Sequence, residues 1–176
     1  MREELVGNEI LLRKLKLKDT DDIYSCVNDK EVIKWLVSLP WPYKREHAKE
    51  FIKKSFSQKK KKTAFDFAIC FPDDNRVIGC ISLNKIDNVN RKAEIGYWLS
   101  RKHWGKGIMS EALWLIERFA FKDLKLNRIY AYVLEENRSS AGVLEKRSFK
   151  NEGKLRKNQK IRGKYYNTII YSKLRR

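Results

Sequence analysis

The fold is decided by the stretch KAEIGYWL at residues 92–99 and by the two segments that follow it, KHWGKG at 102–107 and IMSEALWLIERFAF at 108–121. Apolar and aromatic side chains predominate in residues 92–99, which predicts a strand. In residues 108–121 the apolar side chains recur at the spacing of one helical face, and this is the clearest helical signal in the chain. The order is therefore strand, glycine-containing turn and amphipathic helix.

That turn has the chemistry of a phosphate-binding loop. The first turn of a helix presents amide groups without partners and a partial positive charge, and Gly105 and Gly107 let an anion approach the backbone closely. Lys102, His103 and Lys106 would add cations. The alternative is a turn that needs glycine only for its backbone angles. Ser110 excludes the dinucleotide-binding pattern Gly-x-Gly-x-x-Gly, and no Gly-Lys-Ser/Thr ending of a nucleotide-hydrolysing loop is present.

The rest of the chain alternates between both kinds of element, which predicts a mixed α+β (α/β mixed) fold with about seven strands and flanking helices. With 176 residues, the chain is expected to form one domain, residues 1–176. Further strands are predicted at 9–15, 64–71, 76–86, 127–134, 149–157 and 164–174. Helices are predicted to begin within 19–22 and to cover 31–37, 44–57 and 138–147.

The charge is unusually positive and unevenly distributed. The chain has 40 Lys or Arg against 22 Asp or Glu, a formal net charge of +18. Residues 44–62 contribute +7 and residues 145–176 contribute +10, so the remainder is nearly neutral. Such segments either attract a polyanion such as RNA or the ribosome, or form an ordinary solvated surface in which Lys59 to Lys62 are a loop tip.

Several classes of protein are disfavoured. No stretch approaches the roughly 20 apolar residues of a membrane-spanning helix, and the segment Met1 to Leu5 has no secretory apolar run, so we expect a cytoplasmic protein without a membrane partner. Three scattered cysteines do not suggest a disulfide framework. Because His47 and His103 are the only histidines and no Cys/His cluster exists, we expect no metal site.

Two stretches, KHWGKG at 102–107 and NRSSAGVLEKRSF at 137–149, resemble motifs of the GNAT N-acetyltransferases, most closely those of the branch of Rim-type ribosomal-protein N-terminal acetyltransferases. The family signature Q/R-x-x-G-x-G/A appears here as Lys102-x-x-Gly105-x-Gly107, with Lys in place of Gln or Arg. Downstream, NRSSAGVLEKRSF at 137–149 is similar to the family segment N-x-x-S-x-x-V-L-E-K-x-G-F. Ser148 departs from this segment, because the pattern has Gly there. The order of elements is similar across nearly the whole chain.

The resemblance implies a twisted sheet that splays open in a V beside the strand at 92–99, with acetyl-CoA in the gap and no metal. It implies that backbone amides from His103 to Met109 hold the pyrophosphate, that Leu99 and Ser100 bind the pantetheine arm, and that Asn137 and Ser140 lie near the thioester. The expected acetyl-CoA-binding residues are Leu99, Ser100, Lys102, His103, Trp104, Gly105, Lys106, Gly107, Ile108, Met109, Asn137 and Ser140.

Acetyl transfer to an amine requires removal of a proton from the amine and stabilisation of the oxyanion and the leaving thiolate. Glu94 is our candidate base, because the family's bases fall on this strand; the alternative is a salt-bridge partner. Ser140 is a candidate donor to the sulfur, although a role as helix N-cap or first-turn residue explains it at least as well. Asn137 is a second catalytic candidate, and the alternative for it is a helix cap. Many relatives carry a tyrosine acid seven residues after the Asn, where this chain has Leu144.

Three functions remain open from the sequence. The first is transfer of acetyl from acetyl-CoA to a protein N-terminal amine, possibly of a ribosomal protein. The second is the same transfer to a small amine, such as a polyamine, an amino sugar or an antibiotic. A polycationic acceptor prefers an acidic groove, which this basic chain supplies poorly. The third is a non-enzymatic, basic nucleic-acid-binding module. The oligomeric state, monomer or homodimer, is left open.

Overall fold

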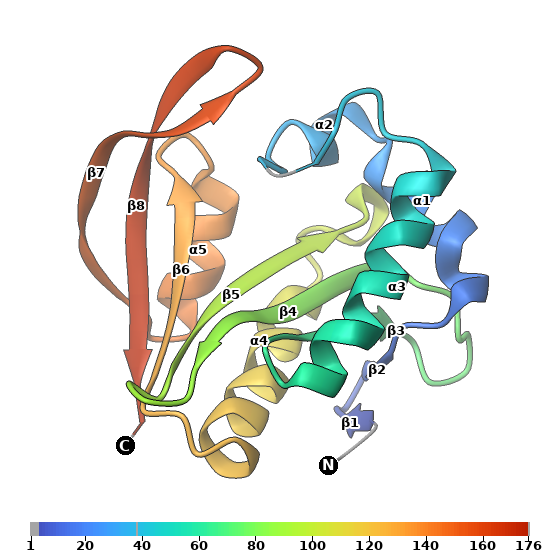
Figure 1. The fold of residues 1–176 in the computed structure, drawn as a ribbon, viewed down its shortest axis with the longest axis horizontal. Coiled ribbons are helices and arrows are strands. Elements are labelled where there is room, and N and C mark those ends of the chain that lie inside the picture. The colour runs from blue at the N-terminus through green and yellow to red at the C-terminus, as the bar shows by residue number, and fades with distance from the viewer. Residues whose placement is uncertain (1–3, 38, 176) are drawn as a thin grey trace.

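The computed structural model describes residues 4–37 and 39–175 and shows one open mixed sheet with helices on both faces (Figure 1). Residues 1–3, 38 and 176 of the expected domain lie outside these ranges. The strands are β1 (Glu4–Val6), β2 (Leu11–Lys14), β3 (Phe65–Cys70), β4 (Gly79–Asp87), β5 (Lys92–Leu99), β6 (Arg128–Leu134), β7 (Lys150–Ile161) and β8 (Lys164–Leu174). The helices are α1 (Thr20–Val27), α2 (Lys30–Ile33), α3 (Arg45–Lys61), α4 (Ile108–Arg118) and α5 (Arg138–Lys146).

The predicted mixed α+β class is confirmed, with two corrections. The described sheet has eight strands rather than about seven, because β1 adds a short edge strand that pairs with β2. Only Leu5 of β1 is buried, and three residues are too few to show alternation in a sequence. Helix α3 continues through Lys61, so three of the four lysines expected in a loop form its last turn, and Lys62 follows as a left-handed cap.

The strands diverge where the site is expected. The strand order is β1-β2-β3-β4-β5-β6-β8-β7, and β5 and β6 form the parallel pair. This pair has only three partners, from Lys92 opposite Arg128 to Glu94 opposite Tyr130, whereas β4 stays paired with β5 as far as Leu99. Figure 1 shows β5 and β6 together at one end and separating toward the other. The predicted V-shaped opening is therefore present.

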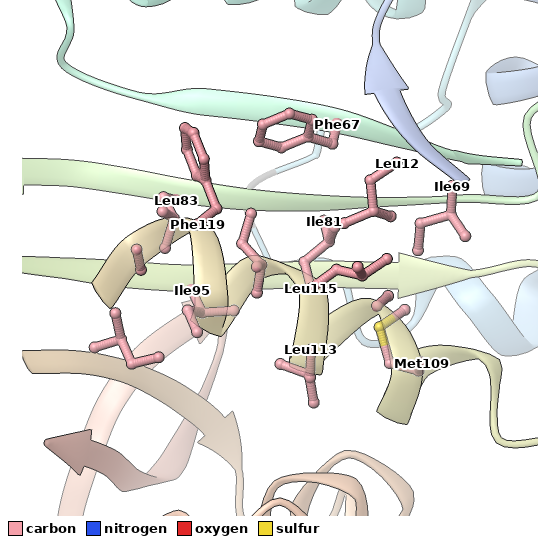
Figure 2. Close-up of a cluster of buried hydrophobic side chains, with 14 of the residues drawn as sticks. Leu12, Phe67, Ile69, Ile81, Leu83, Ile95, Met109, Leu113, Leu115 and Phe119 are labelled. Carbon is pink, nitrogen blue, oxygen red and sulfur yellow. The ribbon is translucent and has the colours of Figure 1, made fainter. Parts of the chain in front are cut away.

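The two faces of β5 belong to two separate cores. Ala93, Ile95 and Leu99 pack in the larger core, which α4 and α5 cover, as Figure 2 shows around Ile95, Met109 and Phe119. Trp98 packs against the smaller core formed with α1, α2 and α3. Because side chains alternate along a strand, Glu94 points to the side of α1–α3 and Tyr97 to the side of α4 and α5. This alternation places the candidate site residues on opposite faces of the sheet.

Helix α5 ends in a left-handed cap at Ser148, the position where the family pattern has Gly. Ser148 adopts a left-handed conformation, with φ of 62°. Its amide donates to the Glu145 carbonyl (2.9 Å), and the Phe149 amide donates to the Leu144 carbonyl (3.0 Å). These are the two bonds of a Schellman cap, and the buried side chains of Leu144 and Phe149 complete it. The position therefore needs the conformation that glycine adopts most easily.

Asp66 is a buried carboxyl group between β3 and β4. Ser82 Oγ donates to its Oδ1 (2.5 Å), while Oδ2 has no hydrogen-bond partner in the described chain. Burial raises the pKa of Asp66, and the bond from Ser82 offsets only part of that rise. A carboxyl whose pKa is higher in the folded state disfavours folding as pH rises from the unfolded pKa of about 4 through the folded value.

We therefore expect Asp66→Asn to raise Tm at pH 7.5 and to leave it unchanged at pH 2.5, where the carboxyl is protonated in both states. An increase of about 2–4 °C corresponds to roughly 1 kcal/mol in a chain of this size. Circular-dichroism melts of both proteins at the two pH values test this. An equal increase in Tm at both pH values would show that packing, and not ionisation of the carboxyl, causes the difference in Tm between the two proteins.

Candidate acetyl-CoA site

The turn between β5 and α4 leaves the start of the helix open. Gly105 (φ 75°) and Gly107 (φ 79°) are both in the left-handed region, and Gly107 is the N-cap of α4. No side chain caps this end of the helix. A Cβ built on either glycine has no heavy atom within 4 Å. The amides at the start of α4 therefore face open space, as an anion site requires.

The free amides form a shorter run than the sequence predicts. The His103 amide donates to the Ser100 carbonyl (3.0 Å) and the Trp104 amide to the Arg101 carbonyl (3.1 Å), within a 3₁₀ turn. The first bond of α4 runs from the Glu111 amide to the Gly107 carbonyl (3.1 Å). Among the described residues, no partner accepts from the amides of 105–109. Ile108 and Met109 contribute only backbone, because their side chains are buried in the larger core.

Two lysines and a histidine lie next to this run in the chain. Lys102 and Lys106 are exposed, and His103 Nδ1 is buried without a hydrogen-bond partner. Burial lowers the pKa of His103, and the charges of Lys106 and Lys102 lower it further, so the imidazole is neutral near pH 7. An orphaned buried nitrogen beside a set of free amides fits a phosphate-bearing ligand, to which a neutral imidazole can donate.

Leu99 and Ser100 are already partly engaged in the fold. The Ser100 amide donates to the Ile78 carbonyl (2.8 Å). The Trp104 indole donates to the Leu99 carbonyl (2.8 Å) and thereby folds the turn back onto the end of β5. A carbonyl oxygen has two lone pairs, so Leu99 can still accept from a pantetheine amide, whereas the Ser100 amide has no hydrogen left to donate.

Asn137 and Ser140 come together at the start of α5. Asn137 is the N-cap, and its Oδ1 accepts from the Ser140 amide (3.2 Å). The Tyr97 phenol oxygen lies 2.8 Å from Ser140 Oγ and 3.2 Å from the Ser140 carbonyl oxygen, and its single hydrogen can donate to either one. Tyr97 thus links β5 to α5 across the diverging strands. Burial raises the pKa of Tyr97 far above its ordinary value, so the phenol keeps its proton.

Glu94 lies on the other face of the sheet, at the point where the strands separate. Its carboxylate is 22% exposed, and Lys85 Nζ lies 2.8 Å from Oε2. Glu94 is beside Tyr130 in the last pair of the β5–β6 ladder. Lys85 is 72% exposed and comes from the irregular part of β4, where the pairing register shifts between Asn84 and Asp87. The predicted catalytic residues therefore lie on two faces of the sheet, Glu94 beside the last β5–β6 pair and Ser140 against Tyr97 of the same strand.

The aromatic residues of this region lie in different environments: some are buried in the core, one is exposed on a loop, and two lie on the face of the sheet that carries Glu94. Tyr43 is a core residue, at 4% exposure. Trp41 is exposed, and the Arg162 guanidinium of the β7–β8 hairpin lies 4.5 Å from its ring centroid. Tyr130 and Tyr132 share the face of Glu94 and contact each other edge to face, with centroids 5.7 Å apart.

Sequence reasoning missed Lys85 and the contact of Tyr97 with Ser140, because neither belongs to a motif.

Two further observations concern other kinds of site. No group of three or more His, Cys, Asp or Glu side chains within residues 4–37 and 39–175 is arranged to hold a metal ion. In the same ranges, no helix has the length and apolar character needed to cross a membrane.

Comparison with known proteins agrees with this geometry. The family model for the acetyltransferase (GNAT) domain matches residues 9–150. The chain is 36% identical to the uncharacterised N-acetyltransferase p20 of Bacillus licheniformis, covering 99% of this chain and 97% of p20. It also resembles the solved structure of the microcin C7 self-immunity acetyltransferase MccE in complex with acetyl-CoA and AMP, with a TM-score of 0.84, 28% identity and coverage of 96% and 93% of the two chains.

A third likeness is to the ribosomal-protein-S5-alanine acetyltransferase from Vibrio fischeri, with a TM-score of 0.87, 26% identity and coverage of 97% of this chain and 96% of that one. The expected family, its Rim-like character and the dependence on acetyl-CoA are thus confirmed at the level of the enzyme class. Because the family model matches most of the chain and p20 aligns over nearly all of it, the protein belongs to the GNAT acetyltransferase family.

Proposed function

We propose that this enzyme transfers the acetyl group of acetyl-CoA to the N-terminal α-amine of a protein. The observation that carries the proposal is the uncapped start of α4, with free amides and two left-handed glycines at the end of β5. The likeness to a ribosomal-protein acetyltransferase supports a protein acceptor. The net charge of +18 argues against a polyamine, which the basic surface would repel.

The residues have separate tasks in this proposal. The amides of Gly105 to Met109 hold the pyrophosphate, and His103 and Lys106 add polar contacts to it. Acetyl-CoA supplies the activated thioester. On the other face, Glu94 takes a proton from the incoming ammonium, directly or through one water, so that the amine lone pair is free to attack. Asn137 caps α5 and so holds Ser140 in place.

Ser140 acts on the leaving group as a hydrogen-bond donor. As the new C–N bond forms and the C–S bond breaks, the electron pair of the C–S bond remains on sulfur, and the nitrogen loses its second proton to solvent. A thiol with a pKa near 8.5 leaves as a thiolate, so a hydroxyl hydrogen bond stabilises it without full proton transfer, and the thiolate then takes a proton from solvent. When the Tyr97 phenol donates to Ser140 Oγ, the hydrogen of Ser140 is free to point at the sulfur. Tyr97 is then a positioning residue that replaces the tyrosine missing at Leu144.

We expect Tyr97→Phe to lower kcat about fivefold, with little change in KM for acetyl-CoA, because one hydrogen bond of about 1 kcal/mol is lost. In a Ser140→Ala background the same substitution should lower kcat less than twofold. Tyr171→Phe is the matched control, since its phenol donates to Glu145 Oε1 (2.8 Å) of the same helix. Equal losses in both backgrounds would assign Tyr97 a purely structural role.

The proposal as a whole is tested by acetyl-CoA consumption against peptides with free N-termini, the same peptides with acetylated N-termini and one internal lysine, a polyamine and an amino sugar. We expect turnover with the free N-termini alone. Turnover confined to a small amine would replace the protein acceptor.

A further inference from the structure

The tip of the β7–β8 hairpin carries cations that have no acidic partner. No Asp or Glu occurs between Gly153 and the end of the chain. Near the base of the hairpin, Lys154 pairs with Glu135 (2.6 Å) and Lys173 with Glu117 (2.7 Å). The exposed tip cations instead lie over aromatic rings, with no carboxylate partner in the described chain: Lys160 over Tyr165, Arg162 over Trp41 and Lys164 over Tyr166.

The other basic segment of the chain has a structural explanation that the hairpin lacks. Lys59, Lys60 and Lys61 form the last turn of α3, where cations interact favourably with the partial negative charge of the helix end. A two-stranded hairpin has only a small net dipole, so nothing in its backbone favours cations. The fold of the hairpin therefore leaves the tip charges available to a partner outside it.

The hairpin places this tip beyond the open end of the V. The last β6–β8 partner is Leu134 opposite Thr168, so the tip extends past the end of β6 from which β5 has already diverged. The β7–β8 register shifts between Leu155 and Gln159, and such bulges bend a strand. Figure 1 shows the tip turning toward α2, and the contact of Arg162 with Trp41 joins it to the segment between α2 and α3.

We propose that the tip, defined as Lys160, Arg162, Lys164 and Trp41, binds an acidic segment of the acceptor protein downstream of the N-terminal residue that is acetylated. The inference rests on the function proposed above. Guanidinium and ammonium groups form charge-assisted hydrogen bonds with carboxylates, and Arg162 does so with two donors. The cation–π contacts hold the side chains in place before the acceptor arrives.

The register indicates where in the acceptor the acidic residues belong. Lys164, the first tip residue along β8, lies eight residues beyond Ser172, and Ser172 is opposite Tyr130, the partner of Glu94. At about 3.3 Å per residue, Lys164 is roughly 26 Å from the Glu94 end of the opening. An extended acceptor whose amine is at Glu94 therefore reaches the tip with residues about nine to twelve. The path from Glu94 to the tip starts where the acceptor amine is expected to bind. A peptide with a free N-terminus therefore fits this path better than RNA does.

The test uses two peptides with the same first eight residues, one with Asp and Glu at positions nine to twelve and one with Ser and Gln there. With saturating acetyl-CoA, we expect kcat/KM to be at least tenfold higher for the acidic peptide, through KM. In Lys160→Glu/Lys164→Glu this ratio should fall to one or below. Lys60→Glu/Lys61→Glu, an equal charge change at exposed positions of α3, should keep the ratio.

The outcomes separate the two proposals. If neither peptide is acetylated, the proposed protein acceptor is wrong. If both are acetylated at equal kcat/KM by the unaltered enzyme, the N-terminal acceptor stands and the acidic docking surface is wrong. If the peptides are acetylated equally and the hairpin variant has instead lost salt-sensitive binding to a single-stranded RNA probe, the tip is a nucleic-acid surface.

Discussion

Gly107→Trp is expected to abolish acetyl-CoA binding, with Kd raised more than 100-fold, while the fold is retained. Gly107 has nothing within 4 Å of its Cβ position, so an indole there projects over the amides at the start of α4 without displacing the core. Charge-assisted hydrogen bonds contribute about 1.5–3 kcal/mol each, and loss of two of them accounts for at least a 100-fold change. Isothermal titration with CoA measures the loss.

The control for this experiment is Gly163→Trp at the hairpin tip. Gly163 has φ of 85° and is equally open around its Cβ position, so the substitution introduces the same backbone strain and the same side chain away from α4. Its Kd for CoA should match that of the unaltered enzyme, and circular dichroism should show both variants folded. If the Kd of Gly107→Trp for CoA is within threefold of that of the unaltered enzyme, the start of α4 is not the site that binds the pyrophosphate.

The sequence predicts best what depends on neighbouring residues. The range 92–99 of β5, the helix beginning at Ile108 and the glycines before it all follow from local periodicity and backbone freedom, and the structure confirms each. The cap of α5 is also predictable locally: the family pattern has Gly where this chain has Ser148, and Ser148 adopts the left-handed conformation that glycine favours. The helix predicted at 31–37 is wrong in its extent, because α2 covers only Lys30–Ile33 and four residues are too few for an amphipathic pattern.

What sequence reasoning misses depends on contacts between distant residues. Tyr97 meets Ser140 across 43 positions, and Arg162 meets Trp41 across a still longer separation. The pairing of Lys85 with Glu94 depends on a shift in strand register, which the residue pattern does not reveal. The amide of His103 appears available in the motif, yet the 3₁₀ turn before α4 uses it. Such contacts decide which of the motif atoms remain free for chemistry.

The second large effect is expected at Glu94. Glu94→Gln should lower kcat about 100-fold near pH 7, the lower end of the range for loss of a general base, with little change in KM for acetyl-CoA. An α-amine has a pKa near 7.7–8.0, so more of the acceptor is already unprotonated at higher pH and the deficit should narrow above pH 8.5. Rates of the two enzymes from pH 6 to 9.5 measure this change.

Lys85→Gln distinguishes a base from an ion-pair partner. Lys85 Nζ lies 2.8 Å from the Glu94 carboxylate, and their hydrogen bond raises the pKa of Lys85, so an ammonium already occupies the place that the acceptor ammonium must reach. Removing Lys85 removes that competitor, and we expect KM for the acceptor to fall two- to fivefold. If Glu94 only anchors Lys85, both substitutions break the same pair and must reduce activity alike. Opposite effects therefore leave Glu94 as the base, with Lys85 as the residue that the acceptor displaces.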